Sequence, residues 1–440
     1  MKTAPFVKKF TPVAGIFIIF MTIWSILSEI WIAVAPWPSG LFAWFAAFLL
    51  VSQLSKSQTL QIGILLLIGI LALSIGVSLG SQTDWLRLLD TNAGLLSMLA
   101  AVSFLRLIAI KNEESVTEIP HGIGAYCQTM IAVAIFGACI NVSAHLLIAD
   151  KVSGGKKLDL FAAKSIVRAF IGGPTWSPFF AGMAVVLTYV ADAHFLVVMA
   201  FGLPFTVIGL TIVLACAAFF NKEEVRHFKG YPMTLSNLWL PGILVVSVLV
   251  GHKWLPHASI LAVIALSALM VSIIGLCFSY GLIGATLALK HHIMKGLPKM
   301  VNELVLFLAA GVLAIGLRTL VAATELNLPF EGGFDATAAT ILLGGMVLLS
   351  LLGVHPVISI AVATPLLTPI DPNSQLLALT FVLSWSLGAC ASPLSGLNLI
   401  FQGRFGIPSV KLAMSNWPYV SIMFVVSTVF LHGAAIILGV

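Results

Sequence analysis

The stretch LQIGILLLIGILALSIGVSLG, residues 60–80, contains no charged residue and is long enough to cross a lipid bilayer. The hydrocarbon core of a bilayer is about 30 Å thick, which takes about 20 apolar residues as a helix. Residues 195–219 and 259–289 are equally free of charge. In lipid, every backbone N–H and C=O must be hydrogen-bonded within the protein, so these runs are predicted to be α-helices.

The whole chain has the composition of a membrane protein. Of its 440 residues, 60% are hydrophobic and 9% are charged, against roughly 45–50% and about 25% in soluble domains. The net charge of +6 comes from Lys and Arg in short loops, so it is interpreted as a topology signal and not as a nucleic-acid site. We expect an all-α polytopic membrane protein in the bacterial inner (plasma) membrane.

Eleven apolar runs are predicted to be transmembrane helices. They lie at residues 11–35, 39–55, 60–80, 92–110, 123–149, 195–219, 236–254, 257–289, 300–321, 336–370 and 416–438. Two further apolar stretches, 160–190 and 374–403, are interrupted by Gly, Pro and Ser. We interpret these two as re-entrant hairpins. If they are counted as single crossings, the basic residues of several loops no longer fall on one side of the membrane.

Basic residues in short loops mark the cytoplasmic side of a membrane protein. With the N-terminus inside, the predicted cytoplasmic residues are Lys2, Lys8, Lys9, Lys56, Lys222, Arg226, Lys229, Lys290–Lys299, Arg404 and Lys411. The acidic loops 84–90 and 325–335 then lie outside. One segment disagrees, because this arrangement also places the basic residues of 151–168 outside.

The two interrupted stretches resemble each other. The first reads IGGPTWSPFFAGM (171–183) and the second LGACASPLSGLNL (387–399), and each centres on a Ser-Pro pair. The prolines of these pairs, Pro178 and Pro393, are 215 residues apart, which is close to half of the chain. This spacing predicts an internal repeat.

Each repeat is predicted to contain five crossings and one hairpin. Because five is an odd number, the second repeat is inverted relative to the first. The predicted organisation is an extra N-terminal helix (1–38), repeat 1 (39–220, hairpin near 160–190) and repeat 2 (221–440, hairpin near 374–403).

The hairpin tips are predicted to bind the ligand. A helix that ends inside the membrane leaves backbone groups unpaired, and helix N-termini attract anions. Ser177 and Ser392 are interpreted as helix N-caps, with Pro178 and Pro393 at the first helical position. The candidate substrate- or ion-binding residues are Asn141, His145, Lys164, Arg168, Gly173, Thr175, Ser177, Pro178, His355, Ser392, Pro393, Ser395, Gly396 and Asn398.

Hydroxyl and amide oxygens at the tips can also ligate a hard cation such as Na⁺. The residues predicted to bind it are Ser177, Ser392, Ser395 and Asn398. No resident cofactor is expected, and the coupling ion is Na⁺ or H⁺.

The charged and titratable candidates have two interpretations each. Lys164 and Arg168 lie four residues apart on one helix face, either as counter-charges for an anionic substrate or with their heads at the membrane interface. His145 and His355 lie at polar breaks upstream of the hairpins, INVSAH (140–145) and GVHP (353–356). They are either buried core residues or members of a proton-coupling path.

The segment CASPLSGLNL (residues 390–399) resembles the hairpin tips of the ion transporter superfamily. That group includes divalent anion–sodium symporters, membrane subunits of tripartite (TRAP) carriers, arsenite exporters and one class of Na⁺/H⁺ antiporter. The layout of one extra helix and two inverted units also resembles the hydroxycarboxylate transporters. The chain lacks the Ser-Asn-Thr triplet of the anion symporters, and Gly172-Gly173 matches only part of the Gly-rich tips of the hydroxycarboxylate carriers.

The expected function is secondary active transport of a small anion by Na⁺ or H⁺ symport. A carboxylate is the first candidate for this anion. Neither hairpin contains Asp or Glu, which a Na⁺/H⁺ antiporter usually needs. The alternatives are a cation/proton antiporter or oxyanion exporter that uses Glu29 or Glu303, and a non-transporting assembly component. No HExxH, Walker or zinc-spacing motif is present, so the chain is not expected to be an enzyme.

The expected partners follow from this function. They are a small anionic substrate, membrane lipid and a second copy of the chain in a homodimer, with no nucleic acid. A tripartite carrier would add a periplasmic binding protein.

Overall fold

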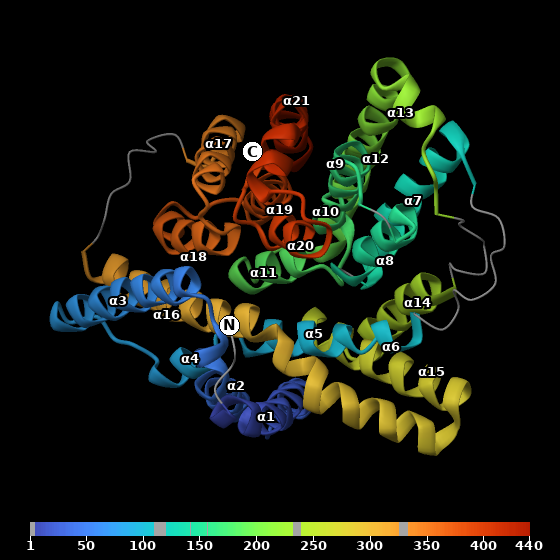
Figure 1. Cartoon of the computed structure of the whole chain (residues 1–440). Coiled ribbons are helices and arrows are strands. Elements are labelled where there is room, and N and C mark those ends of the chain that lie inside the picture. Colours follow the sequence, from blue (N-terminus) through green and yellow to red (C-terminus); the bar gives the residue numbers. More distant parts are fainter. Residues whose placement is uncertain (1–4, 110–119, 141, 156, 232–238, 325–332) are drawn as a thin grey trace. The chain divides into compact units, whose positions relative to one another are not determined.

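The computed structural model describes residues 5–109, 120–140, 142–155, 157–231, 239–324 and 333–440. Within them the chain is helical, and its β-bridge joins His121 to Lys229. Nine helical segments of this part are long and apolar enough to cross a membrane, and four shorter helices are also apolar. The chain is therefore an all-α polytopic membrane protein, as predicted (Figure 1).

The helices form two compact units. Unit 1 consists of residues 1–113, 242–327 and 361–369, and unit 2 of residues 114–241, 328–360 and 370–440. Unit 1 contains α1 (Pro5–Ile30), α2 (Trp37–Leu50), α3 (Lys56–Ser78), α4 (Trp85–Asp90), α5 (Ala93–Ser103), α6 (Arg106–Ala109), α14 (Trp239–Trp254), α15 (Ile260–His291) and α16 (Val301–Thr324). Unit 2 contains α7 (Gly122–Ile140), α8 (Val142–Ser153), α9 (Leu160–Phe170), α10 (Gly173–Trp176), α11 (Ala181–Tyr189), α12 (Phe195–Phe220), α13 (Lys222–Arg226), α17 (Ala336–Leu351), α19 (Ser374–Ala391), α20 (Gly396–Phe405) and α21 (Ser409–Leu438). Helix α18 (Pro356–Leu367) belongs partly to each.

Unit 1 contains a very close pair of helices, α3 and α16. A Cβ on Gly69 would lie 2.8 Å from the backbone of Leu313, and a Cβ on Gly76 would lie 2.7 Å from that of Thr319. A Cβ on Gly316 would overlap the carbonyl oxygen of Gly69. Residue numbers rise together along the contact, so the helices run parallel. Glycines let the two backbones approach this closely, as in many membrane helix pairs.

Replacing Gly316 by leucine is expected to push α3 and α16 apart and to lower the thermal unfolding temperature of the purified protein. Overpacking typically costs about 1–3 kcal/mol, and here the new side chain meets backbone instead of a flexible side chain. Gly63→Leu is the matched control, because the space around Gly63 on α3 is open. Equal unfolding temperatures for the two variants would contradict this account.

The first interrupted stretch, 160–190, crosses unit 2 instead of turning back. Near its start, Phe161 packs on Phe228, which follows α12 and α13, with the ring centroids 6.5 Å apart. At its other end, His194 leads directly into α12. Helix α12 has 26 residues and is about 39 Å long at 1.5 Å per residue. The re-entrant hairpin predicted here is therefore corrected to a discontinuous transmembrane helix made of α9, α10 and α11.

Helices α12 and α21 run antiparallel. Gly209 of α12 lies beside Met423 of α21, with the Sδ atom 3.6 Å from the position of a Cβ. Nearer the start of α12, Phe201 packs on Phe430, with the ring centroids 6.0 Å apart. The start of α21 therefore lies at the end of α12 that leads into α13.

The second interrupted stretch, 374–403, also crosses unit 2. Its end meets the start of α21, where the Ser409 N–H donates to Gln402 Oε1 at 2.8 Å. Its start meets the start of α12, where Gln375 Oε1 accepts from the His194 N–H at 3.2 Å. Those two points lie at opposite ends of unit 2, because α12 and α21 are antiparallel. The second predicted re-entrant hairpin is thus a discontinuous helix too, made of α19 and α20.

The re-entrant element of the first half is instead the pair α7 and α8, which was predicted as one crossing over 123–149. At the start of α7, the Gly122 N–H donates to the Phe228 carbonyl at 3.1 Å. At the end of α8, Val152 lines a surface cavity together with Lys229. Both ends of the pair therefore lie beside α13, so the chain enters and leaves unit 2 on one side.

Helices α17 and α18 form the corresponding element of the second half. A Cβ on Gly388, near the end of α19, would lie 2.5 Å from Ser350 of α17 and 3.2 Å from Pro356 of α18. The chain must then return to Ser374, where α19 begins. The single helix predicted for 336–370 is therefore broken between α17 and α18, and the second half turns back there.

The helices of unit 2 recur at a constant spacing. Helix α7 starts at Gly122 and α17 at Ala336, 214 residues later, and the same spacing separates α8 from α18, α9 from α19 and α12 from α21. At the breaks the spacing is 215, as between Pro178 and Pro393. Residues that are equivalent by this spacing meet, because the Ser386 hydroxyl donates to the carbonyl of Ile171, 215 positions earlier. Contacts between equivalent residues are expected about a two-fold axis of inverted repeats. The limits of the two repeats over the whole chain stay a prediction.

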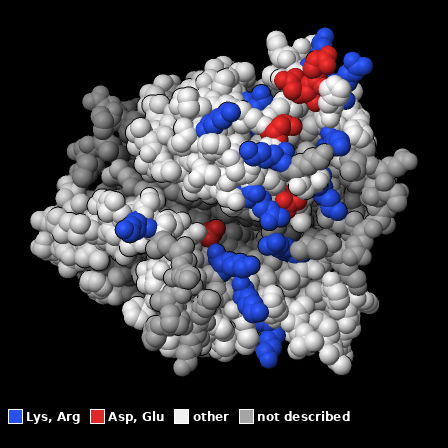
Figure 2. All heavy atoms as spheres, viewed as in Figure 1, with Lys and Arg blue, Asp and Glu red and all other residues white. Residues whose placement is uncertain are grey.

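The exception in the distribution of basic residues disappears with this topology. Asp159 lines the same cavity as Glu224 and Lys229, so the basic segment 151–168 begins at the end of unit 2 that holds the basic residues 222–229. The predicted placement of residues 151–168 and 222–229 on opposite sides is therefore wrong. In Figure 2, side chains of both charges gather over α13, and much of the remaining surface on that face is uncharged.

Candidate functional site

The break in the first discontinuous helix is built on Ser177. This residue ends α10 in an extended conformation (φ −93°, ψ 123°), as expected for a residue before proline. Its hydroxyl donates to the carbonyl of Ala138 and accepts from the Phe179 N–H at 3.2 Å. Helix α11 begins three residues after Pro178. The prediction that Ser177 caps the following helix and Pro178 opens it is wrong.

The break in the second discontinuous helix has the same local structure. Ser392 ends α19 with ψ 124°, and its hydroxyl accepts from the Leu394 N–H at 3.3 Å. Pro393 lies in the turn. The N-cap of α20 is Ser395, whose hydroxyl accepts from the Asn398 N–H at 3.2 Å. The capping role predicted for Ser392 therefore belongs to Ser395.

The residues of the first break contact α12 directly. The Thr175 hydroxyl is fully buried, 3.0 Å from the carbonyl oxygen of Gly202 and 2.7 Å from the hydroxyl of Thr206. Thr206 donates to the carbonyl of Gly172 at 2.9 Å. A Cβ on Gly202 would overlap the carbonyl oxygen of Thr175, so this contact requires glycine.

Arg168, in the last turn of α9, joins the first discontinuous helix to α21. Its Nε donates to Asn416 Oδ1 at 2.9 Å and its Nη2 to the Ser415 carbonyl at 2.8 Å. The guanidinium lies 5.2 Å from the ring centroid of Tyr419. No carboxylate of the described residues pairs with it. In the part of the chain that the structure describes, a half-buried positive charge thus lies in a predicted membrane-spanning segment without a negative partner.

A tight crevice with about 10 Å³ of free volume lies beside Arg168, where the two halves of unit 2 meet. Its polar lining is Arg168, Thr206, Ser386 and Tyr419. Ser386 and Ile171, the equivalent residues of the two halves, both border it. The crevice therefore lies at the contact between equivalent residues of the two discontinuous helices.

Asn398 has a buried acceptor without a partner. Its Nδ2 donates to the carbonyl oxygens of Ser392 at 2.8 Å and Cys390 at 3.3 Å. Its Oδ1 has no hydrogen-bond partner among the described residues. A buried unpaired acceptor costs about 1–3 kcal/mol, so a cation or donor at this oxygen would be favourable.

The four residues predicted to bind Na⁺ come from both breaks. Ser392, Ser395 and Asn398 lie together at the second break, whereas Ser177 lies at the first. No hydrogen bond between described residues links the Ser177 and Ser392 hydroxyls.

The two candidate histidines have different surroundings. His145 is fully buried, and neither ring nitrogen has a hydrogen-bond partner in the described part of the chain. Its ring stacks on Phe401, with centroids 5.6 Å apart and planes at 8°. His355 is half-buried, and its Nδ1 accepts from the Val357 N–H at 3.3 Å, at the start of α18. Only His145 combines full burial with unpaired ring nitrogens.

The remaining described candidates are a lysine of α9 and two glycines at the breaks. The Lys164 ammonium lies 5.6 Å from the ring centroid of Phe161. Gly173 opens α10 and Gly396 opens α20. Asn141 lies outside the described residues.

Sequence reasoning missed the residues that bind Arg168. Asn416 and Ser415 lie inside a long apolar helix, where polar side chains are uncommon. The sequence SNWPY, residues 415–419, carried that signal beside a helix-interior proline.

The carboxylates of the alternative antiporter mechanism lie in unit 1. Glu29 Oε2 accepts from the Ser259 N–H at 2.9 Å, where α15 begins. Glu303 is exposed in the first turn of α16, where a negative charge is favoured by the helix dipole.

One pentapeptide, GVSLG at 76–80, matches the GxSxG pattern of serine hydrolases. Ser78 ends α3, and its hydroxyl donates to the Ile75 carbonyl at 2.7 Å. A nucleophile elbow requires a strand before the serine and a helix after it. A helix precedes Ser78 instead, so this match is not a nucleophile elbow.

Two discontinuous helices in antiparallel halves, each preceded by a re-entrant element, place the chain among integral membrane proteins with an inverted-repeat architecture. Among solved structures, it is similar to the YdaH transporter of Alcanivorax borkumensis, whose structure revealed an unusual topology. The TM-score is 0.57 at 12% identity, covering 84% of this chain and 97% of that one. At this identity the similarity concerns the fold. No family model and no curated protein matches the sequence.

Proposed function

We propose that the protein is a secondary transporter that moves a small anion, a carboxylate in the first place, across the bacterial inner membrane by alternating access. The observation that carries this proposal is the positive charge of Arg168. A charge inside the membrane is costly unless it is paired. Arg168 has hydrogen-bonding partners but no carboxylate among the described residues, so an anionic substrate supplies the missing charge.

The position of this charge supports the proposal. Arg168 borders the crevice between the two discontinuous helices, with hydroxyls of Thr206 and Ser386 beside it. Helix breaks at matching positions of inverted halves are typical of the binding site of secondary transporters. The similarity to a transporter fold points in the same direction.

The coupling ion is Na⁺ or H⁺ in this proposal. The unpaired Asn398 Oδ1 favours Na⁺, because amide and carbonyl oxygens are its usual ligands in proteins. His145 is the group that would carry a proton, because both of its ring nitrogens are unpaired.

Uptake by proteoliposomes tests the function. Purified protein is reconstituted and offered a panel of radiolabelled mono-, di- and tricarboxylates, with an inward Na⁺ gradient, an inward proton gradient or neither. We expect gradient-dependent accumulation of at least one carboxylate. Absence of uptake throughout the panel, with proton or cation exchange in its place, would support the antiporter alternative.

The Arg168→Gln variant is expected to reduce uptake at low substrate concentration by roughly tenfold to a hundredfold. Hydrogen bonds to a charged group contribute about 1.5–3 kcal/mol, which corresponds to that range. Arg226→Gln is the matched control, because Arg226 is exposed on α13 of the same unit. Thermal unfolding of both variants separates a lost anion site from a lost fold. Normal uptake by a folded Arg168→Gln protein would refute the assigned role.

A further inference from the structure

Unit 1 contains a cavity of about 720 Å³ at the ends of α3 and α16. Its polar lining includes Gln82, Thr83, Asp84, Arg87, Arg318 and Thr319. All of the residues that line it belong to unit 1. The cavity is therefore separate from the crevice at Arg168, which unit 2 forms alone.

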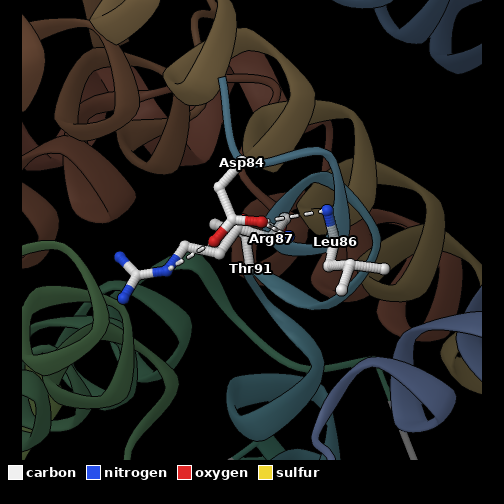
Figure 3. Close-up of polar contacts among 4 residues, drawn as sticks. All are labelled: Asp84, Leu86, Arg87 and Thr91. Carbon is white, nitrogen blue, oxygen red and sulfur yellow. Dashed lines mark hydrogen bonds and ion pairs between the residues drawn. The ribbon is translucent and has the colours of Figure 1, made fainter. Parts of the chain in front are cut away.

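Residues 81–84 form one wall of the cavity, and their conformation is set by the end of α3 and the start of α4. Gly80, two residues after the end of α3, has φ 97°, and the Ser81 N–H donates to the Gly76 carbonyl at 3.1 Å. This is the usual helix end with a left-handed glycine. Asp84 then caps α4 by accepting from the N–H groups of Leu86 and Arg87 at 3.1 and 3.3 Å (Figure 3). These hydrogen bonds fix the conformation of the chain between the two helix ends.

The charges of the cavity do not balance. Asp84 forms an ion pair with Arg87, with Oδ2 and Nε 3.6 Å apart (Figure 3). Arg318 of α16 has neither an ion pair nor a hydrogen bond with the described residues, and its side chain is exposed. Among the described residues that line the cavity, two guanidinium groups and one carboxylate leave one positive charge unbalanced.

Neutral donors accompany this charge. The Thr83 and Thr319 hydroxyls lie 3.2 Å apart and join the loop to α16, and Gln82 adds an amide. Guanidinium groups bind carboxylate and phosphate with two parallel hydrogen bonds. The lining therefore offers the donors that an anionic oxygen group requires.

We propose that this cavity binds an oxyanion, a phosphate or a carboxylate, through Arg318 with Arg87 and the threonine hydroxyls. By the distribution of basic residues, α3 and α16 both begin on the cytoplasmic side, after Lys56 and the cluster 290–299. Their far ends, and the cavity, then face the outer side. The oxyanion comes either from the headgroup of an anionic phospholipid in the outer leaflet or from a small anion in solution.

Thermal unfolding of the full-length protein in a neutral detergent tests the proposal. The probes are short-chain phosphatidylglycerol, short-chain phosphatidylcholine as the uncharged-headgroup control, inorganic phosphate and acetate, each titrated separately. An anionic probe is expected to raise the unfolding temperature in a saturable way. For Arg318→Gln the apparent affinity is expected to be about tenfold weaker. Arg106→Gln, an exposed arginine of the same unit outside the cavity, is expected to behave as the wild type.

The probes also distinguish the two sources. Stabilisation by phosphatidylglycerol but not by phosphate or acetate assigns the site to lipid, whereas stabilisation by the small anions assigns it to a solute. If Arg318→Gln does not fold, Arg318→Lys keeps the charge but loses the paired hydrogen bonds, and weaker binding is still expected. No stabilisation of the wild type by any anionic probe, or equal affinity in wild type and a folded Arg318 variant, overturns the proposal.

Discussion

A cysteine in place of Asp192 is expected to react with a membrane-impermeant maleimide added to intact cells. A cysteine in place of Lys157 is expected to react only after the membrane has been permeabilised. Asp192 is exposed just before α12, and Lys157 is exposed just before α9. If 160–190 crosses unit 2, these two positions lie on opposite sides of the membrane. The background protein lacks the five native cysteines.

Two further positions calibrate the labelling. Lys222, at the start of α13, is expected to behave as Lys157, and Asp335, which caps α17, as Asp192. A re-entrant hairpin at 160–190 would instead expose positions 157 and 192 on the same side. That result would refute the crossing, independently of which side is cytoplasmic.

The Gly202→Ala variant is expected to lose transport almost completely while α12 itself remains helical. The added methyl group would overlap the carbonyl oxygen of Thr175, so the first helix break has to move away from α12. Displacement of binding groups by about 1 Å can reduce turnover about a hundredfold. The measurement is uptake of the carboxylate identified for the wild type.

Gly433→Ala is the control for this substitution. Gly433 lies in α21, and nothing lies within 4 Å of the position of its Cβ. Uptake by this variant is expected to match that of the wild type. Comparable uptake by the two variants would show that the contact between Gly202 and Thr175 does not position the site.

The fold class was predictable because membrane solvation acts on each apolar run separately. The charge-free stretch 60–80 lies in α3 except for its last two residues, and 195–219 lies within α12. The Ser-Pro pairs also located both helix breaks, because a residue before proline is biased away from helical geometry. The bias alone does not break a helix, since Leu203 and Trp417 precede prolines inside α12 and α21.

The direction of the chain at the breaks was not predictable in the same way. Whether α9 to α11 turn back or cross depends on contacts with distant residues, such as Phe161 with Phe228. The distribution of basic residues held part of the answer, because the segment 151–168 fits the cytoplasmic side only if the first stretch crosses. The partners of Arg168 were missed for the same reason, since Asn416 lies 248 positions away in the sequence.

The contact between Ile171 and Ser386 has an evolutionary consequence. Where equivalent residues meet, the interface is isologous, and a substitution at the axis changes the surroundings of both discontinuous helices together. Substitutions at residues that share a contact combine non-additively. Ser386 is bonded to Ile171 through the backbone carbonyl, so epistasis should concentrate at position 386, and adaptation to a new substrate is expected to begin with residues that touch only one half, such as Thr206.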